Sequence, residues 1–376
     1  MHTVWHFRKS LPIASLILVL TCVAAAQTTQ DVAALKTKAA SGDAKAQCAL
    51  GTEYEYGIKV KQDFKQAAAW FRKSAEQGDA EAEGRLGALY LNGTGVARDY
   101  SQAALWLRKA ADQGVDGAQL NLGKIYENGQ GVPQDYAQAA TWFRKAADQG
   151  SGLAQAELGY LYEKGLGVTQ NDSQAMQWYR KAAEQGEATA QYNLAVMYGH
   201  GQGVPQDYAQ AVIWFRKAAE QGDAEAQYNL GVFYSSGQGV PQDLAQSVFW
   251  WRKAAEQGEA IAQFNLGLAY DKGQGVPQDY TQAGQWYRKA AEQGDAGAQL
   301  NLGALYARGA GLPQDYAEAY FWFDLAGVGK LDAANTESAT QNRDRAASYL
   351  TPADLSRAQE RARRWFESHA ANPAAQ

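Results

Sequence analysis

Apolar positions follow a helical spacing along most of the chain, and the same pattern returns every 36 residues. In one unit, Ala226, Leu230 and Tyr234 lie four residues apart and form a single apolar stripe on a helix. After a glycine-rich segment, Trp250 and Ala254 lie four residues apart and mark the buried face of a second helix. Each unit is therefore predicted to be a hairpin of two helices.

Three columns of residues keep this period in all eight units, with no insertion or deletion. The tryptophans are Trp70, Trp106, Trp142, Trp178, Trp214, Trp250, Trp286 and Trp322. The tyrosines are Tyr54, Tyr90, Tyr126, Tyr162, Tyr198, Tyr234, Tyr270 and Tyr306. The leucines are Leu50, Leu86, Leu122, Leu158, Leu194, Leu230, Leu266 and Leu302. Eight repeats of 36 residues therefore occupy residues 43–330.

Glycine, proline and aspartate mark the predicted helix ends. Gly237 follows the first helix of its unit, where a left-handed residue commonly ends a helix, and Pro241 cannot continue one. Asp243 is placed to cap the second helix, which Gly258 stops. These residue types favour two short helices over one long helix.

A single hairpin is too small to fold alone. Ordering its 36 residues costs on the order of 50 kcal/mol, at ~1.5 kcal/mol per residue, which one Leu, one Tyr and one Trp cannot offset. Each hairpin must therefore bury its apolar stripe against the next one. The predicted fold is all-α: a right-handed α-solenoid of helical hairpins, forming a tetratricopeptide-like superhelix.

Both ends of this array are predicted to be capped. Residues 27–42 contain one helix that closes the first repeat. Residues 331–376 contain two capping helices and a short tail, and the last helix starts at Thr351 with Asp354 in the capping-box position. These segments would shield the apolar faces of the terminal repeats.

Residues 1–26 have the features of a secretory signal peptide. A basic pair, Arg8 and Lys9, precedes an apolar run, which ends in small residues just before Gln27. We expect the mature chain to begin near Gln27 and to be exported, either to the periplasm or as a secreted protein. The apolar run is shorter than the ~20 residues of a membrane span, so no integral span is expected after signal removal.

Cys22 leaves an alternative open. If this cysteine were lipidated, the protein would be a lipid-anchored envelope assembly factor, although Leu20 and Thr21 fit a lipoprotein pattern poorly. If the leader is removed, Cys48 is the one remaining cysteine, and stability must come from packing rather than from an internal disulfide.

Charge and composition limit the classes of partner that the chain is expected to bind. The chain has a net charge of −5, whereas nucleic-acid-binding proteins normally carry a basic surface. Its 46% hydrophobic and 20% charged residues are typical of a folded chain. We expect a monomer that binds a protein or peptide and no nucleic acid. The repeated Arg-Lys pairs of the second helices could form a basic stripe for an anionic partner, but a solvated face with ion pairs to acids four residues beyond each arginine is favoured.

The repeat consensus resembles the Sel-one-like repeat family, which is related to the tetratricopeptide repeats. The matching motifs are Ala-x-x-x-Leu-Gly-x-x-Tyr, Gly-x-Gly-Val-x-x-Asp and Ala-x-x-Trp-x-x-Lys-Ala-Ala-Glu-Gln-Gly, repeated over residues 43–330. The departures are Lys59 for a loop glycine, Ala195 for the helix glycine and Asn171 for the capping aspartate. The resemblance implies a curved scaffold or adaptor for protein complexes, often secreted or periplasmic in bacteria.

The sequence offers little catalytic chemistry. Without the leader it has two histidines, His200 and His369, and no histidine or cysteine cluster with the spacing of metal ligands. No catalytic, cofactor-binding or metal-binding residue is assigned. A cysteine-rich branch of the resembled family is linked to β-lactam binding and hydrolysis. This enzyme alternative is disfavoured because the paired cysteines of that branch are missing here.

The functional hypothesis is a non-enzymatic scaffold or adaptor of the cell envelope that binds a protein or peptide in the solenoid groove. A column of asparagines just before the core leucine is predicted to pair with an extended peptide backbone: Asn121, Asn193, Asn229, Asn265 and Asn301. A neighbouring column that varies between repeats would select the partner's side chains: Lys124, Val196, Val232 and Leu268. In the structural alternative, the asparagines bond a backbone carbonyl of the neighbouring hairpin.

Overall fold

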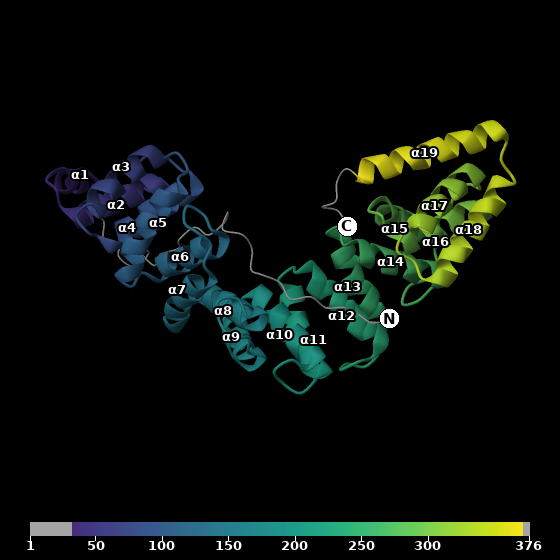
Figure 1. The fold of residues 1–376 in the computed structure, drawn as a ribbon, viewed down its shortest axis with the longest axis horizontal. Helices are drawn as coiled ribbons and strands as arrows, with labels where there is room; N and C mark the ends of the chain where they lie inside the picture. The colour runs from purple at the N-terminus through teal and green to yellow at the C-terminus, as the bar shows by residue number, and fades with distance from the viewer. Residues whose placement is uncertain (1–31, 371–376) are drawn as a thin grey trace. The chain divides into compact units, whose positions relative to one another are not determined.

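The computed structural model describes residues 32–370, and every regular element in that part of the chain is an α-helix (Figure 1). The chain divides into two compact units, Met1–Gln206 and Asp207–Gln376. The first unit contains α1 (Val32–Ala40), α2 (Ala44–Tyr56), α3 (Phe64–Ala75), α4 (Ala80–Asn92), α5 (Tyr100–Asp112), α6 (Asp116–Asn128), α7 (Tyr136–Asp148), α8 (Gly152–Lys164), α9 (Asp172–Glu184) and α10 (Ala188–His200). The second contains α11 (Tyr208–Glu220), α12 (Ala224–Ser236), α13 (Leu244–Glu256), α14 (Ala260–Lys272), α15 (Tyr280–Glu292), α16 (Ala296–Arg308), α17 (Tyr316–Val328), α18 (Ala333–Ala347) and α19 (Pro352–Ala370).

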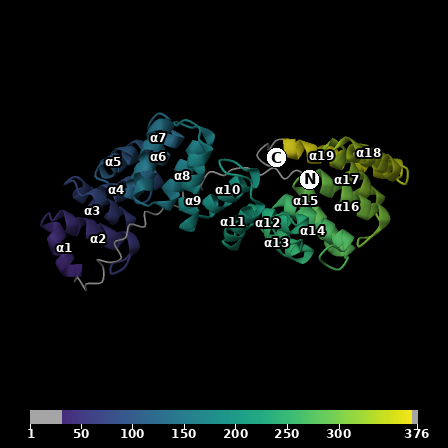
Figure 2. The same ribbon diagram turned by 90° about the horizontal axis from the view of Figure 1, so that it is seen from below.

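Helices pack with their sequence neighbours within each unit. In the first unit, α4 packs against α5 of its own hairpin and against α3 of the preceding hairpin. In the second unit, α14 makes the same two kinds of contact with α15 and α13 (Figure 2). The predicted all-α solenoid of helical hairpins is therefore confirmed in each unit.

The helix ends follow from the residues that the sequence places there. Gly237 ends α12 in the left-handed conformation, with φ of 71°, and its N–H donates to the Phe233 carbonyl at 2.9 Å. The Asp243 carboxylate accepts a hydrogen bond of 2.9 Å from the Gln246 N–H and so caps α13. The same types of cap recur from repeat to repeat, so the hairpin geometry is set locally.

The repeated apolar columns form the core. All eight leucines of the leucine column are no more than 1% exposed. Gly231 lets α13 approach α12 closely, because a Cβ added there would lie 2.4 Å from Cδ1 of Trp251. The leucines and six of the eight tryptophans are buried as predicted, whereas five of the eight column tyrosines are half-buried.

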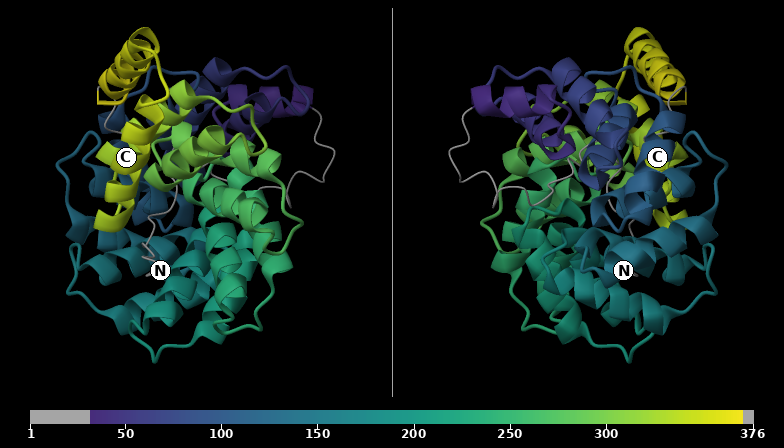
Figure 3. Two further views of the ribbon diagram at one scale, coloured as in Figure 1. Left: turned by 90° about the vertical axis from the view of Figure 1, so that its right-hand side faces the viewer. Right: turned by 90° about the vertical axis from the view of Figure 1, so that its left-hand side faces the viewer.

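Helices outside the eight repeats cover both ends of the array. At the start, Leu35 and Ala39 of α1 are buried in a cluster with Leu50. At the other end, α18 and α19 pack against α17, as Figure 3 shows in its left view. The Thr351 hydroxyl accepts a hydrogen bond of 3.2 Å from the Asp354 N–H, which is the predicted start of α19.

The predicted signal peptide and Cys22 lie outside the described residues, so the expected cleavage near Gln27 stays a prediction. Among the helices in the described range, none combines the length and the apolar character that a membrane crossing requires.

Candidate functional site

The asparagine column is largely covered. Asn121, Asn193, Asn229 and Asn265 are between 0% and 7% exposed, and Asn301 is half-buried. The sequence analysis placed these amides at a groove, but the neighbouring hairpins bury them. A partner-binding role for the column stays a prediction.

Tyrosines lie beside Asn193, Asn265 and Asn301. Burial raises the pKa of Tyr179 well above its usual value, and the Asn193 amide opposes that rise. Asn265 acts in the same way on the pKa of Tyr228. Within the described residues, both amide atoms of Asn121 lack a hydrogen-bond partner. The column thus sits among side chains of the repeat array itself.

The varied column is buried to different extents. Lys124 and Val196 are buried, at 3% and 0% exposure, whereas Val232 and Leu268 are half-buried. The same column carries Ala304 in the eighth repeat, where it lines an open cavity. Its half-buried members are therefore better placed to contact a partner than the asparagines.

Lys124 has structural partners. Its ammonium forms an ion pair with Glu157 of α8 and lies 3.5 Å from the Glu127 carboxylate on its own helix. The side chains of both glutamates are fully buried. Because buried charges are costly unless paired, this cluster ties α6 to α8.

The Arg-Lys pairs of the second helices do more than face solvent. Each arginine donates to the hydroxyl of a column tyrosine 18 residues later, as in the 2.6 Å bond from Arg252 to Tyr270. The pairs are Arg72–Tyr90, Arg108–Tyr126, Arg144–Tyr162, Arg180–Tyr198, Arg216–Tyr234, Arg252–Tyr270 and Arg288–Tyr306. Each lysine covers a column tryptophan, with Lys217 Nζ 4.0 Å from the Trp214 ring centroid. In place of the predicted ion pairs to acids, the arginines join consecutive repeats, whereas each lysine packs on a tryptophan of its own helix.

A glutamine ladder, not recognised from the sequence, also joins the repeats. Gln155 Nε2 donates to the Ala147 carbonyl at 3.1 Å, and Gln155 Oε1 accepts from Gln185 Nε2 at 2.8 Å. Gln119 and Gln263 make the same two contacts in their own repeats. The available signal was a glutamine three residues before most core leucines.

The second helices carry exposed apolar side chains in the position just before the column tryptophan. Leu105, Ile213 and Phe249 are 46–48% exposed there, whereas Thr141 and Gln177 occupy the same column in other repeats. This variation was visible in the sequence but was not used. Single exposed apolar residues are common on soluble proteins, so this column assigns no function.

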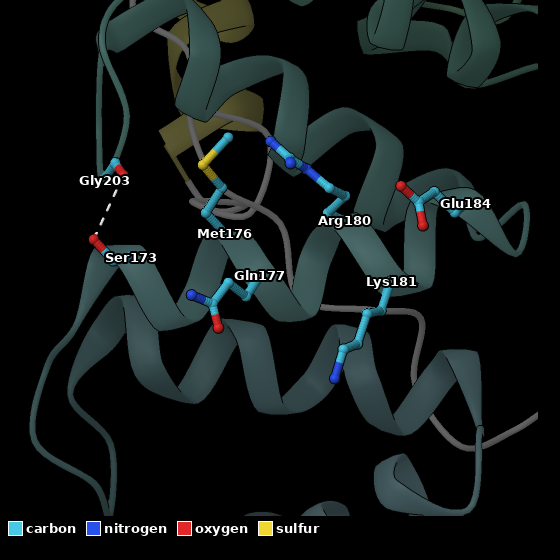
Figure 4. A pocket seen from close by; sticks show the side chains of 7 residues that line it. All are labelled: Ser173, Met176, Gln177, Arg180, Lys181, Glu184 and Gly203. Carbon is cyan, nitrogen blue, oxygen red and sulfur yellow. Dashed lines mark hydrogen bonds between the residues drawn. The ribbon is translucent and has the colours of Figure 1, made fainter.

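Figure 4 shows a cavity along the outer side of α9. Met176 and Arg180 project from one side of the helix, and Gln177 and Lys181 project from the other. Arg180 donates to Tyr198 at 2.6 Å, and Lys181 Nζ lies 4.1 Å from the Trp178 ring centroid. Both cations thus already have structural contacts, with Arg180 joining α9 to α10 and Lys181 packing within α9.

A second cavity, of about 310 Å³, opens between α16, α17 and α18. Arg308 and Arg345 line it together with Ala304. Tyr316 and Tyr349 also line it, and their rings stack with centroids 4.3 Å apart. This cavity combines cations, aromatic rings and small side chains within a single unit.

Cys48, His200 and His369, the cysteine and histidines that catalysis would need, lie in three different helices. Burial raises the pKa of the Cys48 thiol well above its ordinary value, so the thiol stays protonated and packs as an apolar group. His200 is exposed at the end of α10, and His369 stacks on Trp365 with centroids 3.8 Å apart. In the described part of the chain, no group of three or more His, Cys, Asp or Glu side chains could hold a metal ion.

The hairpin array defines an α-solenoid repeat protein. The chain matches the Sel1 repeat over nine segments: 44–79, 80–115, 117–151, 152–187, 188–223, 224–259, 260–295, 296–327 and 345–372. It therefore belongs to the Sel1 repeat family. The ninth segment covers the end of α18 and all of α19, which the sequence analysis treated as part of the C-terminal cap.

One solved structure supports this assignment, and a second is similar in sequence. A Sel1 repeat protein from Oxalobacter formigenes is 39% identical, with 82% of this chain and 89% of that chain covered and a TM-score of 0.62. The protective antigen c5321 of uropathogenic Escherichia coli strains, which displays an SLR fold, is 35% identical, with 92% and 88% covered and a TM-score of 0.49. A comparison with curated proteins found no match. The Sel1 repeat solenoid generally serves as a non-catalytic scaffold for protein interactions.

Proposed function

We propose that this chain is a non-enzymatic scaffold, exported to the cell envelope, that binds a protein or peptide along its first helices. This proposal rests on one observation: a column of residues on the first helices varies between repeats, while the core residues beside it do not. The core leucines are identical in every repeat, while the half-buried positions of the neighbouring column change from Val232 to Leu268 to Ala304. Packing of the shared frame does not require that change, and selective contact with a partner would use it.

Site-specific photo-crosslinking in the native host tests the surface. A photoreactive residue at position 268, on the first helix of its hairpin, should yield a discrete crosslinked product. The same residue in place of Gln285, which is exposed on the second helix of the same hairpin, is the matched control. Equal yields of the same product at both positions, or none at position 268, would contradict binding along the first helices.

Export is tested separately, by mass spectrometry of the mature N-terminus. A chain that begins at Gln27 supports soluble export. An acylated N-terminal Cys22 would instead identify a lipid-anchored envelope protein, and an intact Met1 on the native protein would contradict export.

A further inference from the structure

The cavity between α16, α17 and α18 carries two cations without acidic partners. Neither Arg308 nor Arg345 forms an ion pair within the described residues, and the described side chains that line the cavity include no acid. The nearby arginines Arg343, Arg357 and Arg361 each pair with a carboxylate. Two arginines without acidic partners give this cavity a positive local charge, although the whole chain has a net charge of −5. The cavity should therefore attract an anion.

The arrangement of Arg308 leaves most of its donors available. Its Nε donates to the Ala304 carbonyl at 3.2 Å, and its guanidinium lies 6.0 Å from the Tyr280 ring centroid. These contacts orient the side chain while using one of its five N–H donors. An oriented guanidinium can bind a carboxylate through two parallel hydrogen bonds.

The repeat sequence explains why the cavity lies here. Leu268 and Val232 occupy the equivalent position in the two preceding repeats, whereas the eighth repeat has Ala304. The shorter side chain leaves space beside Ala307 and Ala346. The cavity thus lies at the junction between the eighth repeat and α18, where a small residue faces a helix outside the repeated pattern.

Stacked tyrosines supply an apolar wall. The rings of Tyr316 and Tyr349 are inclined by only 16°, and Tyr349 is 55% exposed. A side chain next to a bound carboxylate could pack on such a wall, since aromatic surfaces contribute much of the binding energy at protein interfaces. The volume, about 310 Å³, is at the lower end of the range for ligand pockets and suits one or two residues of a peptide.

We infer that this cavity binds a carboxylate of an acidic peptide segment, with Arg308 and Arg345 holding the carboxylate and an adjacent apolar side chain packing on the two tyrosines. This inference rests on the proposed scaffold function and assigns it a partner chemistry. The carboxylate could belong to an Asp or Glu side chain or to the C-terminus of the partner.

Fluorescence anisotropy with the full-length mature protein tests the binding. The probe is a fluorescein-labelled pentapeptide that ends in leucine and aspartate with a free C-terminus. Three related probes have an amidated C-terminus, an asparagine in place of the aspartate, or both changes. The probe with two carboxylates should bind, and the probe with neither should not. The two intermediate probes show which carboxylate the site uses.

Variants identify the cavity as the site. Arg308→Gln and Arg345→Gln should each weaken probe binding at least about tenfold. Ala304→Leu, which copies the preceding repeat, should fill the cavity and abolish binding without lowering the melting temperature. The control is Lys272→Gln, which removes an exposed cation at the position equivalent to Arg308 one repeat earlier and should leave binding unchanged.

The outcomes separate this inference from the scaffold function. No binding by the wild-type protein at probe concentrations up to about 1 mM would overturn the inference. Equal binding by wild type and Ala304→Leu would overturn it as well, as would equal losses in Lys272→Gln and Arg308→Gln. A crosslinked partner at position 268 that persists in Ala304→Leu, together with failed probe binding, would leave the scaffold function standing.

Discussion

At the residue scale, the same residue type has different roles according to what the next hairpin places beside it. Arg252 contacts a tyrosine of the following repeat, whereas Arg308 and Arg345 face a cavity without an acid. Lys124 is buried against glutamates, although later repeats carry apolar residues such as Val196 and Leu268 in its column. Contacts between repeats, and not residue type alone, decide which side chains are structural.

The Arg–Tyr contacts are predicted to stabilise the array. Arg252→Ala should lower the free energy of unfolding by about 1 kcal/mol, the usual contribution of one hydrogen bond. Tyr270→Phe removes the same bond from the other side. In a double-mutant cycle measured by urea unfolding, the double variant should be less destabilised than the sum of the single variants. Strict additivity would show that this bond does not contribute.

The buried charge cluster gives a second prediction. Lys124→Met should destabilise the protein by ~3–5 kcal/mol, because it leaves two buried glutamates without their cation. Val232→Met, at the same column, should cost less than about 1.5 kcal/mol. Thermal unfolding of both variants makes the comparison. Similar melting temperatures would mean that Lys124 is not needed for folding.

At the element scale, the hairpin is held by close packing of its two helices. In α12, Gly231 lies against Trp251 of α13 with no space for a side chain. Local signals set where each helix starts and ends, but this approach sets how the two helices cross.

Gly231→Ala is therefore predicted to destabilise the protein by ~1–3 kcal/mol, as overpacking in a tight core usually does. Ser236→Ala, at an exposed position of the same helix, should change stability by less than about 0.5 kcal/mol. Chemical denaturation followed by circular dichroism measures both. A neutral Gly231→Ala variant would show that the α12–α13 contact can relax.

At the scale of the whole molecule, stability comes from the sum of contacts between neighbouring hairpins. Within each unit, consecutive helices of the repeats pack against each other, and few contacts link more distant helices. Such an array should tolerate the loss of a complete repeat more readily than the loss of half a repeat.

Deletion of residues 259–294, the seventh repeat, should retain the helical circular dichroism signal per residue with a modest fall in melting temperature. Deletion of residues 259–276 removes only α14 and its loop and breaks the alternation of helices. That variant should lose cooperative unfolding. Collapse of the helical signal in the first deletion would argue against additive stability.

The 36-residue period by itself determined the core positions and the helix ends, because helix spacing and capping are local properties of the chain. Leucine spacing identified the core, and residues such as Gly237 and Asp243 identified the helix ends. Only the tertiary structure decided whether residues at the margin of each apolar stripe, such as Asn193 and Lys124, are buried or exposed. Whether those residues are exposed depends on where the neighbouring hairpin packs, and the spacing within one helix does not contain that information. The cavity beside Ala304 depends likewise on α18, which lies outside the repeated pattern.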